Sequence, residues 1–329
     1  MTTSGYNALT NVTRAAPRPL RMEPSRKILL FGANGQVGHA LAPLLSGLGD
    51  VVACTRADVD LSDRAALAGA IRALVDRERP AIVVNAAAYT AVDRAEAEPE
   101  LAETVNVTAP GAMADAARDA GACLVHFSTD YVFDGEKAGA YVETDPTNPL
   151  SVYGATKLRG EQAIAHACAR HLILRTSWVF GAHGGNFLKT MLKLAQERDS
   201  LRVVADQIGA PTSAALIARS TTAVLRAVAA CPATDPRWGI YHLVAGGETS
   251  WHGYARYAIA KARELGWPIR VADNAIAPIT TAEYPVAARR PANSRLDTAR
   301  IRATFGLDIP DWKAGVDEVL SALQCQQTS

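Results

Sequence analysis

Cysteine is scarce and irregularly spaced in this sequence. The five cysteines stand at positions 54, 123, 168, 231 and 325, an odd number without the spacing of a metal site. This pattern argues against a disulfide framework and against a cysteine-rich metal centre. We therefore expect reduced thiols and a cytoplasmic protein.

The sequence also lacks an excess of one charge and a long hydrophobic run. Its 34 basic and 33 acidic residues give a net charge of +1, which does not favour binding to nucleic acid or to a membrane surface. No apolar run approaches the roughly 20 residues that a membrane-spanning helix needs. We therefore expect no nucleic-acid partner and no membrane association.

The first 25 residues lack hydrophobic periodicity and the apolar core of a secretion signal. They are rich in Thr, Asn, Pro and Arg, and we interpret residues 1–25 as a disordered extension. An arginine-bearing transit peptide is the alternative. With 329 residues, 49% of them hydrophobic, the chain is long enough for one doubly wound domain and a smaller lobe.

A glycine-rich turn follows the first apolar segment, residues 27–31. Glycines at 32, 35 and 38 would allow a tight turn, close approach to a pyrophosphate, and close packing of the next helix. That helix would receive the phosphate charge at its N-terminus. A purely structural turn is the alternative. The predicted cofactor contacts here are Gly32, Asn34, Gly35, Gln36, Val37 and Gly38.

Short apolar runs alternate with helical patterns along the chain, which predicts an α/β fold with a doubly wound, Rossmann-type parallel sheet. We expect this cofactor-binding core over residues 26–181. We expect residues 182–329 to form mainly a smaller C-terminal substrate-binding lobe, with segments interwoven with the core. The predicted strands are 27–31, 50–56, 81–85, 123–128, 171–175, 201–205 and 239–244, and the predicted helices are 63–77, 99–120, 153–169, 186–197 and 214–229.

A tyrosine and a lysine four residues apart indicate carbonyl–alcohol redox chemistry. Tyr153 and Lys157 would lie on the same face of a helix, with the lysine beside the nicotinamide ribose. A cation about 4 Å from the phenol favours phenolate by roughly 4 kcal/mol at an effective dielectric of about 20. The tyrosine would then act as an acid–base group near pH 7. A solvated helix face explains the spacing equally well, but the glycine turn upstream argues against it.

Two hydroxyl groups end the strand predicted before this helix. Ser128 and Thr129 are both candidates to hydrogen-bond a substrate carbonyl, and strand alternation favours only one of them. We choose Thr129 as the third catalytic residue. A serine–threonine turn that satisfies its own backbone is the alternative.

The end of the second predicted strand bears on the choice of cofactor. An acidic residue there would favour NADH, but the sequence has Thr55 and Arg56. A guanidinium suits the 2′-phosphate of NADPH, so we expect NADPH, with NADH as the alternative. Further predicted cofactor contacts after the second and third strands are Asp60, Leu61, Ala86, Ala87, Ala88 and Tyr89.

From about residue 26 onward the sequence resembles the dTDP-4-dehydrorhamnose reductases, a family of extended short-chain dehydrogenases. The glycine turn and the Tyr/Lys pair belong to the whole superfamily. A tryptophan-bearing motif, an Asp-Gln-x-Gly-x-Pro-Thr run and an Arg-Pro-x-x-Ser run are narrower. The motifs that carry the resemblance lie at 32–38, 85–93, 128–135, 153–157, 175–181, 206–212 and 290–297.

The resemblance implies roles for individual residues. Tyr153 would donate the proton to the reduced C4 ketone of dTDP-4-dehydrorhamnose, Lys157 would hold the ribose and lower the tyrosine pKa, and Thr129 would be the hydroxyl partner. Core packing is the alternative role for the tryptophan, and surface charge is the alternative for the arginines. The implied substrate contacts are Ser128, Asp130, Tyr131, Trp178, Asn186, Arg290 and Arg295.

The sequence departs from the family at a magnesium site. Some members dimerise around magnesium held by acidic side chains, including a glutamate just after the glycine loop, where this chain has His39 and Ala40. Magnesium needs oxygen ligands, so we predict no metal site, and we leave open a homodimer of another kind. Other functions also stay open: a reductase of another nucleotide-linked 4-keto sugar, or a non-enzymatic relative such as a methionine adenosyltransferase regulatory subunit.

Overall fold

The structure is a computed structural model that describes residues 26–328. The extension predicted over residues 1–25 lies outside the described residues. Within 26–328, no helix is both long and apolar enough to cross a membrane.

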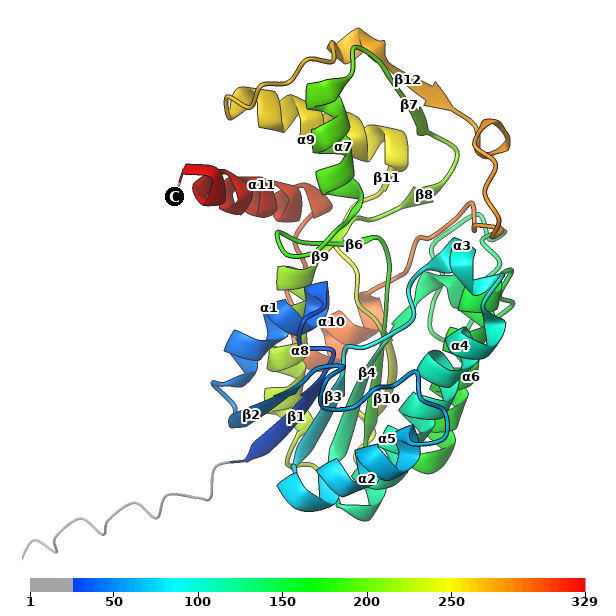
Figure 1. Cartoon of the computed structure of the whole chain (residues 1–329), viewed down its shortest axis with the longest axis vertical. Helices are drawn as coiled ribbons and strands as arrows, with labels where there is room; N and C mark the ends of the chain where they lie inside the picture. The colour runs from blue at the N-terminus through cyan, green and yellow to red at the C-terminus, as the bar shows by residue number, and fades with distance from the viewer. Residues whose placement is uncertain (1–25, 329) are drawn as a thin grey trace, which may run out of the picture.

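A parallel sheet forms the centre of the larger lobe (Figure 1). Its strand order is β10-β5-β4-β3-β1-β2, so the chain changes direction across the sheet between β1 and β3. Ligands of open α/β sheets bind at such a switch point, outside the carboxyl ends of the strands. The six strands are β1 (Lys27–Phe31), β2 (Asp50–Cys54), β3 (Ile82–Asn85), β4 (Cys123–Thr129), β5 (His171–Thr176) and β10 (Gly239–His242).

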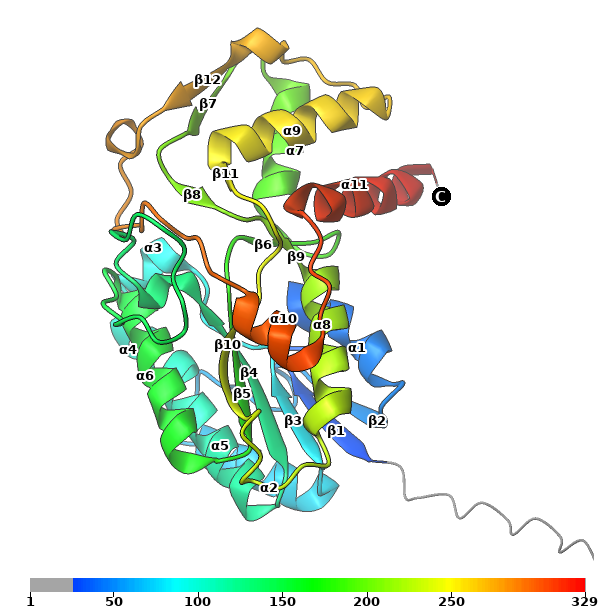
Figure 2. The ribbon, with the colours of Figure 1, turned by 180° about the vertical axis from the view of Figure 1, so that it is seen from behind.

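Helices cover both faces of this sheet, as Figures 1 and 2 show. The four inner strands β1, β3, β4 and β5 are buried on both sides, and their alternate side chains enter two separate apolar clusters. This arrangement explains why their sequences are nearly continuous hydrophobic runs. One face is covered by α1 (Gln36–Leu45), α8 (Ala214–Val228) and α10 (Ala299–Phe305), and the other by α2 (Leu67–Glu78), α5 (Ala109–Asp119) and α6 (Val152–Ala167).

The helix predicted over residues 99–120 is interrupted by a π-helical segment. The chain forms α3 (Val92–Ala95), α4 (Pro99–Glu103), the π segment Thr104–Thr108 and then α5. Asn106 in the π segment bonds the backbone of Tyr89 through both side-chain atoms and donates to the Thr156 hydroxyl. These contacts with residues far along the chain are tertiary, so helical periodicity alone did not reveal the interruption.

The smaller lobe contains three helices around two apolar clusters. It lies beyond the carboxyl ends of the sheet strands (Figure 1). Its helices are α7 (Phe187–Glu197), α9 (Trp251–Glu264) and α11 (Trp312–Thr328). Short strand pairs join its loops: β6 (Val179–Phe180) with β9 (Thr212–Ser213), β8 (Ile208–Gly209) with β11 (Thr249–Ser250), and β7 (Leu201–Val204) with β12 (Ile276–Ile279).

The chain crosses between the lobes more than once. Strand β10 pairs with β5 at the sheet edge, and α8 and α10 pack in the cluster that also contains β1 and β3 residues. All three elements follow residue 181 in the sequence. Segments that follow residue 181 therefore belong to the sheet as well as to the smaller lobe.

Candidate active site

The candidate site begins where β4 ends and α6 starts. The Ser151 side chain caps α6 by accepting a hydrogen bond from the Gly154 amide at 3.2 Å. A Cβ at Gly154 would lie 2.2 Å from the carbonyl oxygen of Tyr131, so only glycine lets the helix start this close to the segment after β4. This contact places Tyr153, in the first turn, beside Thr129.

Burial raises the pKa of the Tyr153 phenol above its usual range. A hydrogen bond with Thr129 opposes this shift, while the nearby charge of Asp130 adds to it. The ring of Tyr131 meets the Tyr153 ring edge to face, with centroids 5.5 Å apart. The phenol is therefore protonated at neutral pH.

Thr129 is fixed by short-range hydrogen bonds. Its hydroxyl donates to Asp130 Oδ1 at 3.0 Å and accepts from the Tyr131 amide at 3.2 Å. Burial raises the pKa of Asp130 to about 6, although hydrogen bonds from Ser294 and Thr129 act in the opposite direction. Asp130 thus orients the Thr129 hydroxyl, and Ser294 brings the C-terminal segment to the same place.

Lys157 is 1% exposed and lies against the backbone of β4. Its Nζ donates to the carbonyl oxygen of Phe127 at 2.7 Å and lies 2.9 Å from Nε2 of His126. Burial lowers the pKa of Lys157 to about 8, and Glu161 opposes this change. Lys157 is not one of the groups that shift the Tyr153 pKa, which differs from the sequence expectation because its amine faces β4.

A buried ion pair holds α6 on the sheet one turn beyond Lys157. The Arg175 guanidinium donates to both carboxylate oxygens of Glu161, at 2.9 and 2.7 Å. The two side chains are only 3% and 2% exposed. Such a buried pair needs this bidentate geometry, because desolvation of both charges is costly. It fixes the position of Lys157 relative to β5.

The glycine turn fits a pyrophosphate. Gly32 has φ +75°, and a Cβ there would lie 2.6 Å from the Ala87 amide nitrogen, so the turn packs directly against the residues after β3. A Cβ at Gly38 would lie 2.1 Å from the Gly32 carbonyl oxygen. Within the described chain no side chain caps α1, which leaves the amides of Gln36 and Val37 for a phosphate.

Arg56 lies at the same edge of the sheet, just after β2. The Gly32 amide donates to the Cys54 carbonyl and so ties the end of β2 to the glycine turn. The Arg56 side chain is 78% exposed, forms an ion pair with Asp60 at 3.3 Å and donates to the Ser62 hydroxyl. Its guanidinium is therefore accessible to a phosphate. Leu61 packs against the apolar cluster under this loop.

The residues after β3 divide into two groups. Ala86 and Ala87 touch Gly32, where their small side chains permit the close approach of the turn. Tyr89 is held by protein contacts: its amide bonds Asn106 and its hydroxyl donates to Glu98. This bond and burial raise the pKa of Tyr89. Ala88 lies between Ala87 and Tyr89 in the chain.

Trp178 follows β5 in a left-handed backbone conformation with φ +48°. Its ring stacks on Trp251, with centroids 3.7 Å apart, and Trp251 donates to the Gln207 side chain at 3.1 Å. A Cβ at Gly209 would lie 2.8 Å from the Trp178 ring. At most one face of the Trp178 ring therefore remains for a sugar.

Asn186 links the smaller lobe to the glycine turn. Its Oδ1 caps α7 by accepting from the Lys189 amide, and its Nδ2 donates to Gln36 Oε1 at 2.9 Å and to the Gly181 carbonyl at 2.8 Å. The side chain that the sequence assigned to the substrate is thus engaged with the protein. It joins the predicted cofactor loop to α7.

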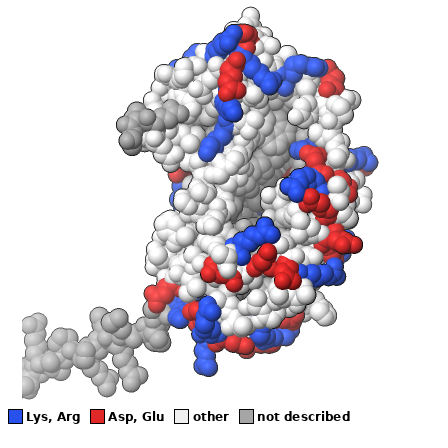
Figure 3. All heavy atoms as spheres, viewed as in Figure 1, with Lys and Arg blue, Asp and Glu red and all other residues white. Residues whose placement is uncertain are grey.

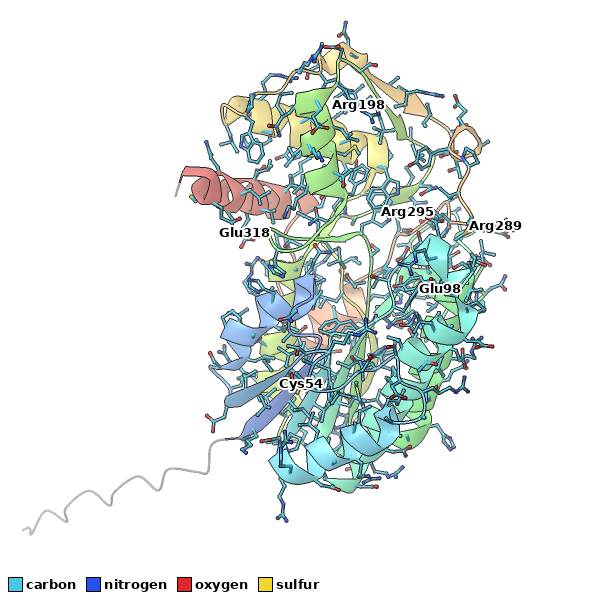
Figure 4. All side chains as sticks on the ribbon, viewed as in Figure 1. Cys54, Glu98, Arg198, Arg289, Arg295 and Glu318 are labelled. Atoms are coloured by element: carbon cyan, nitrogen blue, oxygen red, sulfur yellow. The ribbon has the colours of Figure 1, made fainter. Side chains whose placement is uncertain are left out.

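The two arginines of the C-terminal motif differ in their contacts. Arg290 donates to Asp93 at 2.7 Å, and it opposes the burial that raises the pKa of Tyr131, so it reaches the neighbours of Tyr153. Arg295 bonds the Asn293 side chain, the Ala138 carbonyl and Glu248, and Figure 4 shows it at the junction of the lobes. Arg290 therefore lies at the candidate site, whereas Arg295 connects neighbouring loops of the protein.

The face of the molecule seen in Figure 3 is hollowed between the two lobes. Lysine, arginine and acidic side chains gather beside the hollow. Residues 26–328 include no group of three or more His, Cys, Asp and Glu side chains that would hold a metal ion. His39 lies just after the glycine turn, in the region where some relatives have a glutamate. Its ring stacks on the ring of His183, with centroids 4.1 Å apart.

Sequence reasoning missed two polar residues inside the sheet. His126 in β4 is 1% exposed and contacts Lys157, and Asn85 at the end of β3 contacts His126 at 3.0 Å. A polar residue within an otherwise apolar buried strand is a usable signal for such a site, since it must find a partner there.

The switch point, the uncapped α1 and the Tyr153–Thr129–Lys157 arrangement are those of an extended short-chain dehydrogenase. The RmlD substrate binding domain model matches residues 26–325, so the chain belongs to the family of the dTDP-4-dehydrorhamnose reductases. A curated relative of that name from Shigella flexneri is 47% identical over 296 residues, covering 90% of this chain and 97% of the relative.

Solved structures agree with this assignment. A dTDP-4-dehydrorhamnose reductase from Clostridium acetobutylicum is 35% identical with a TM-score of 0.81, covering 91% of this chain and 99% of the other. One from Bacillus anthracis, in complex with NADP, is 32% identical with a TM-score of 0.80 over the same shares. These likenesses extend over both lobes.

Proposed function

We propose that this chain reduces the C4 ketone of dTDP-4-dehydro-β-L-rhamnose to the alcohol of dTDP-L-rhamnose, with NADPH as the hydride donor. The observation that carries the proposal is the 47% identity to a curated reductase over 97% of its length. The hydroxyl groups of Tyr153 and Thr129 beside the switch point support it. The reaction belongs to the biosynthesis of dTDP-rhamnose for cell-surface polysaccharide.

The chain supplies binding and proton transfer. The reduced nicotinamide supplies the hydride when it is bound. The Tyr153 phenol is protonated at neutral pH, with a pKa that burial raises further, so it has a proton to donate to the oxygen that gains charge. The Thr129 hydroxyl, oriented by Asp130, fixes the position of that oxygen.

NADPH is the proposed cofactor because of Arg56 and of the relative solved with NADP. The exposed guanidinium lies at the sheet edge that holds the glycine turn, where a 2′-phosphate would be paired. NADH stays the alternative, since Asp60 beside Arg56 would accept hydrogen bonds from an unmodified ribose. The proposal includes a cytoplasmic location, in which the scattered thiols stay reduced.

A substrate panel tests the proposal. The purified chain is incubated with NADPH and each of several nucleotide-linked 4-keto sugars, and oxidation of the nicotinamide is followed by absorbance. We expect the highest kcat/KM for dTDP-4-dehydro-β-L-rhamnose. A higher value for another nucleotide or sugar would make that compound the substrate, and no oxidation with any sugar would favour a binding role without catalysis.

A further inference from the structure

A buried row of polar side chains runs from β3 through β4 to α6. Asn85 Nδ2 lies 3.0 Å from His126 Nδ1, and His126 Nε2 lies 2.9 Å from Lys157 Nζ. Each of the three residues is 1% exposed. Water cannot complete a mismatched contact at this depth, so each contact needs one donor and one acceptor.

The orientation of the Asn85 amide sets the first contact. Its Oδ1 accepts from the Ala87 amide at 3.0 Å, and reversal of the side chain would place two N–H groups against each other. Nδ2 is therefore the atom that faces His126. It donates, so His126 Nδ1 must accept and carries no proton.

The tautomer of His126 follows from this contact. Because Nδ1 accepts a hydrogen bond, the ring is not doubly protonated, and burial also holds the pKa of His126 well below its usual range. A neutral imidazole has one N–H group, which is then at Nε2 and faces Lys157. An ammonium group has no lone pair to accept it. The contact with His126 is therefore complete only when Lys157 Nζ is a neutral amine, which accepts from His126 and donates to the Phe127 carbonyl.

The other charged groups around Lys157 do not take the place of its hydrogen bond with His126. Glu161 on the same helix favours the ammonium form, but Arg175 of β5 binds both of its oxygens. Tyr153, one turn before Lys157, is a neutral phenol. Asp130 acts on Tyr153 and is not one of the groups that shift Lys157.

We propose that His126 is a positioning residue that favours the neutral amine of Lys157 on β4, so that Lys157 must be protonated and leave His126 to bind the nicotinamide ribose. The proposed function enters only through the claim that the chain binds NADPH. The affinity for NADPH should then be constant below the pKa of Lys157, about 8, and fall as the pH rises through it.

Two variants reverse the preference of His126 for the neutral amine. Asn85→Asp places a carboxylate against Nδ1, which moves the ring proton to Nδ1 and leaves Nε2 as an acceptor for an ammonium group. His126→Gln offers Nζ a carbonyl oxygen without adding charge. Each change should shift the pH at which NADPH affinity begins to fall upward by about one pH unit, because a hydrogen bond to a charged group alters proton affinity roughly tenfold.

The measurement is NADPH affinity by fluorescence titration from pH 7 to pH 10, a range that lies above the second pKa of about 6 of a phosphate monoester. His242→Gln is the control, because His242 is buried but bonds the Tyr141 carbonyl and not Lys157. We expect its profile to match the unmodified chain. The same onset in all four proteins, or an affinity without pH dependence in the unmodified chain, would overturn the proposal.

The outcome is separable from the fate of the proposed function. NADPH binding that is pH-dependent as predicted, without turnover of any 4-keto sugar, would sustain the role of His126 and refute the reductase. If only one of Asn85→Asp and His126→Gln folds, that variant alone decides. Turnover of the sugar with unshifted binding profiles would sustain the reductase and refute the role of His126.

Discussion

Tyr153 is the residue on which the proposed chemistry depends most. Its phenol is protonated at neutral pH, and desolvation raises its pKa further although the hydrogen bond with Thr129 opposes this shift. A protonated phenol suits a reductase, which must give a proton to a new alkoxide. We expect Tyr153→Phe to lower turnover at least about a hundredfold, the usual contribution of a general acid.

The comparison that isolates this role is Tyr241→Phe. Tyr241 is also buried, but its hydroxyl donates to the Arg237 carbonyl, far from the site along β10. We expect that change to leave turnover nearly unaltered. NADPH affinity should be retained in Tyr153→Phe, since only the phenolic oxygen is removed; near-normal turnover of the substrate by Tyr153→Phe would show that another group is the acid.

Arg56 carries the prediction for cofactor choice. A charge-assisted hydrogen bond to phosphate is worth about 1–3 kcal/mol, so Arg56→Ala should raise the KM for NADPH roughly five- to a hundredfold. The KM for NADH should hardly change, because NADH has no 2′-phosphate. Steady-state kinetics with both cofactors measures this effect.

Arg72→Ala is the matched control for Arg56→Ala. Arg72 is also an exposed arginine in an ion pair, with Asp119, but it lies on α2 away from the glycine turn. It should alter neither KM. Equal losses for NADPH and NADH in Arg56→Ala would identify Arg56 as structural, and dual cofactor use would then be the better interpretation.

At the scale of single residues, the sequence identified the residues of the proposed chemistry but not the directions of their side chains. The pair Tyr153 and Lys157 was evident from helical spacing, but the direction of the Lys157 amine was not. That direction depends on His126 and on a β4 carbonyl, which are distant in sequence and adjacent only after the sheet forms. Asn186 was predicted as a substrate contact, whereas its engagement with Gln36 requires the second lobe to be in place.

At the scale of elements, the strands were predictable because each is a short apolar run. The predicted 27–31 coincides with β1, and 171–175 stops one residue short of β5. What the sequence could not indicate is which strands pair. The run at 239–244 was predicted as a strand without a pairing partner, and β10 completes the central sheet, because burial against α8 and α10 stabilises it there.

The start of α7 offers a test of how one element supports another. Asn186→Ala should destabilise the protein by about 1 kcal/mol through loss of the helix cap. It should also weaken NADPH binding severalfold, because the bond from Asn186 to Gln36 at the start of α1 is lost. Chemical denaturation and NADPH titration measure the two effects.

Ser250→Ala provides the comparison, since Ser250 caps α9 in the same way without touching the glycine turn. It should lose similar stability but keep its NADPH affinity. If both variants weaken NADPH binding equally, the effect of Asn186 is general destabilisation and not support of the cofactor loop.

At the scale of the whole molecule, contacts of the smaller lobe with the glycine turn and the start of α1 join the two lobes. Gln36 bonds Asn186, and the Asn34 carbonyl lies 3.0 Å from the His183 ring. The hollow visible in Figure 3 lies between these lobes. Movement of α7 would therefore shift the glycine turn directly.

The assembly is predicted to be independent of magnesium. Ala40 stands where some relatives have a glutamate, and the residues after Thr212 are Ser-Ala-Ala. We expect EDTA to leave both the activity and the mass in solution unchanged, as measured by light scattering with and without the chelator. A dimer that dissociates on chelation would reveal carboxylate ligands elsewhere in the chain.

The central claim is that the chain delivers hydride to C4 of a dTDP-linked keto sugar. The most direct test uses NADPH deuterated at the transferable position, together with dTDP-4-dehydro-β-L-rhamnose, and analyses the product by mass spectrometry and NMR. The account predicts one deuterium, bound to C4 of dTDP-L-rhamnose, and no such product with Tyr153→Phe on the same timescale. Deuterium at another carbon, or an unlabelled product, would contradict it.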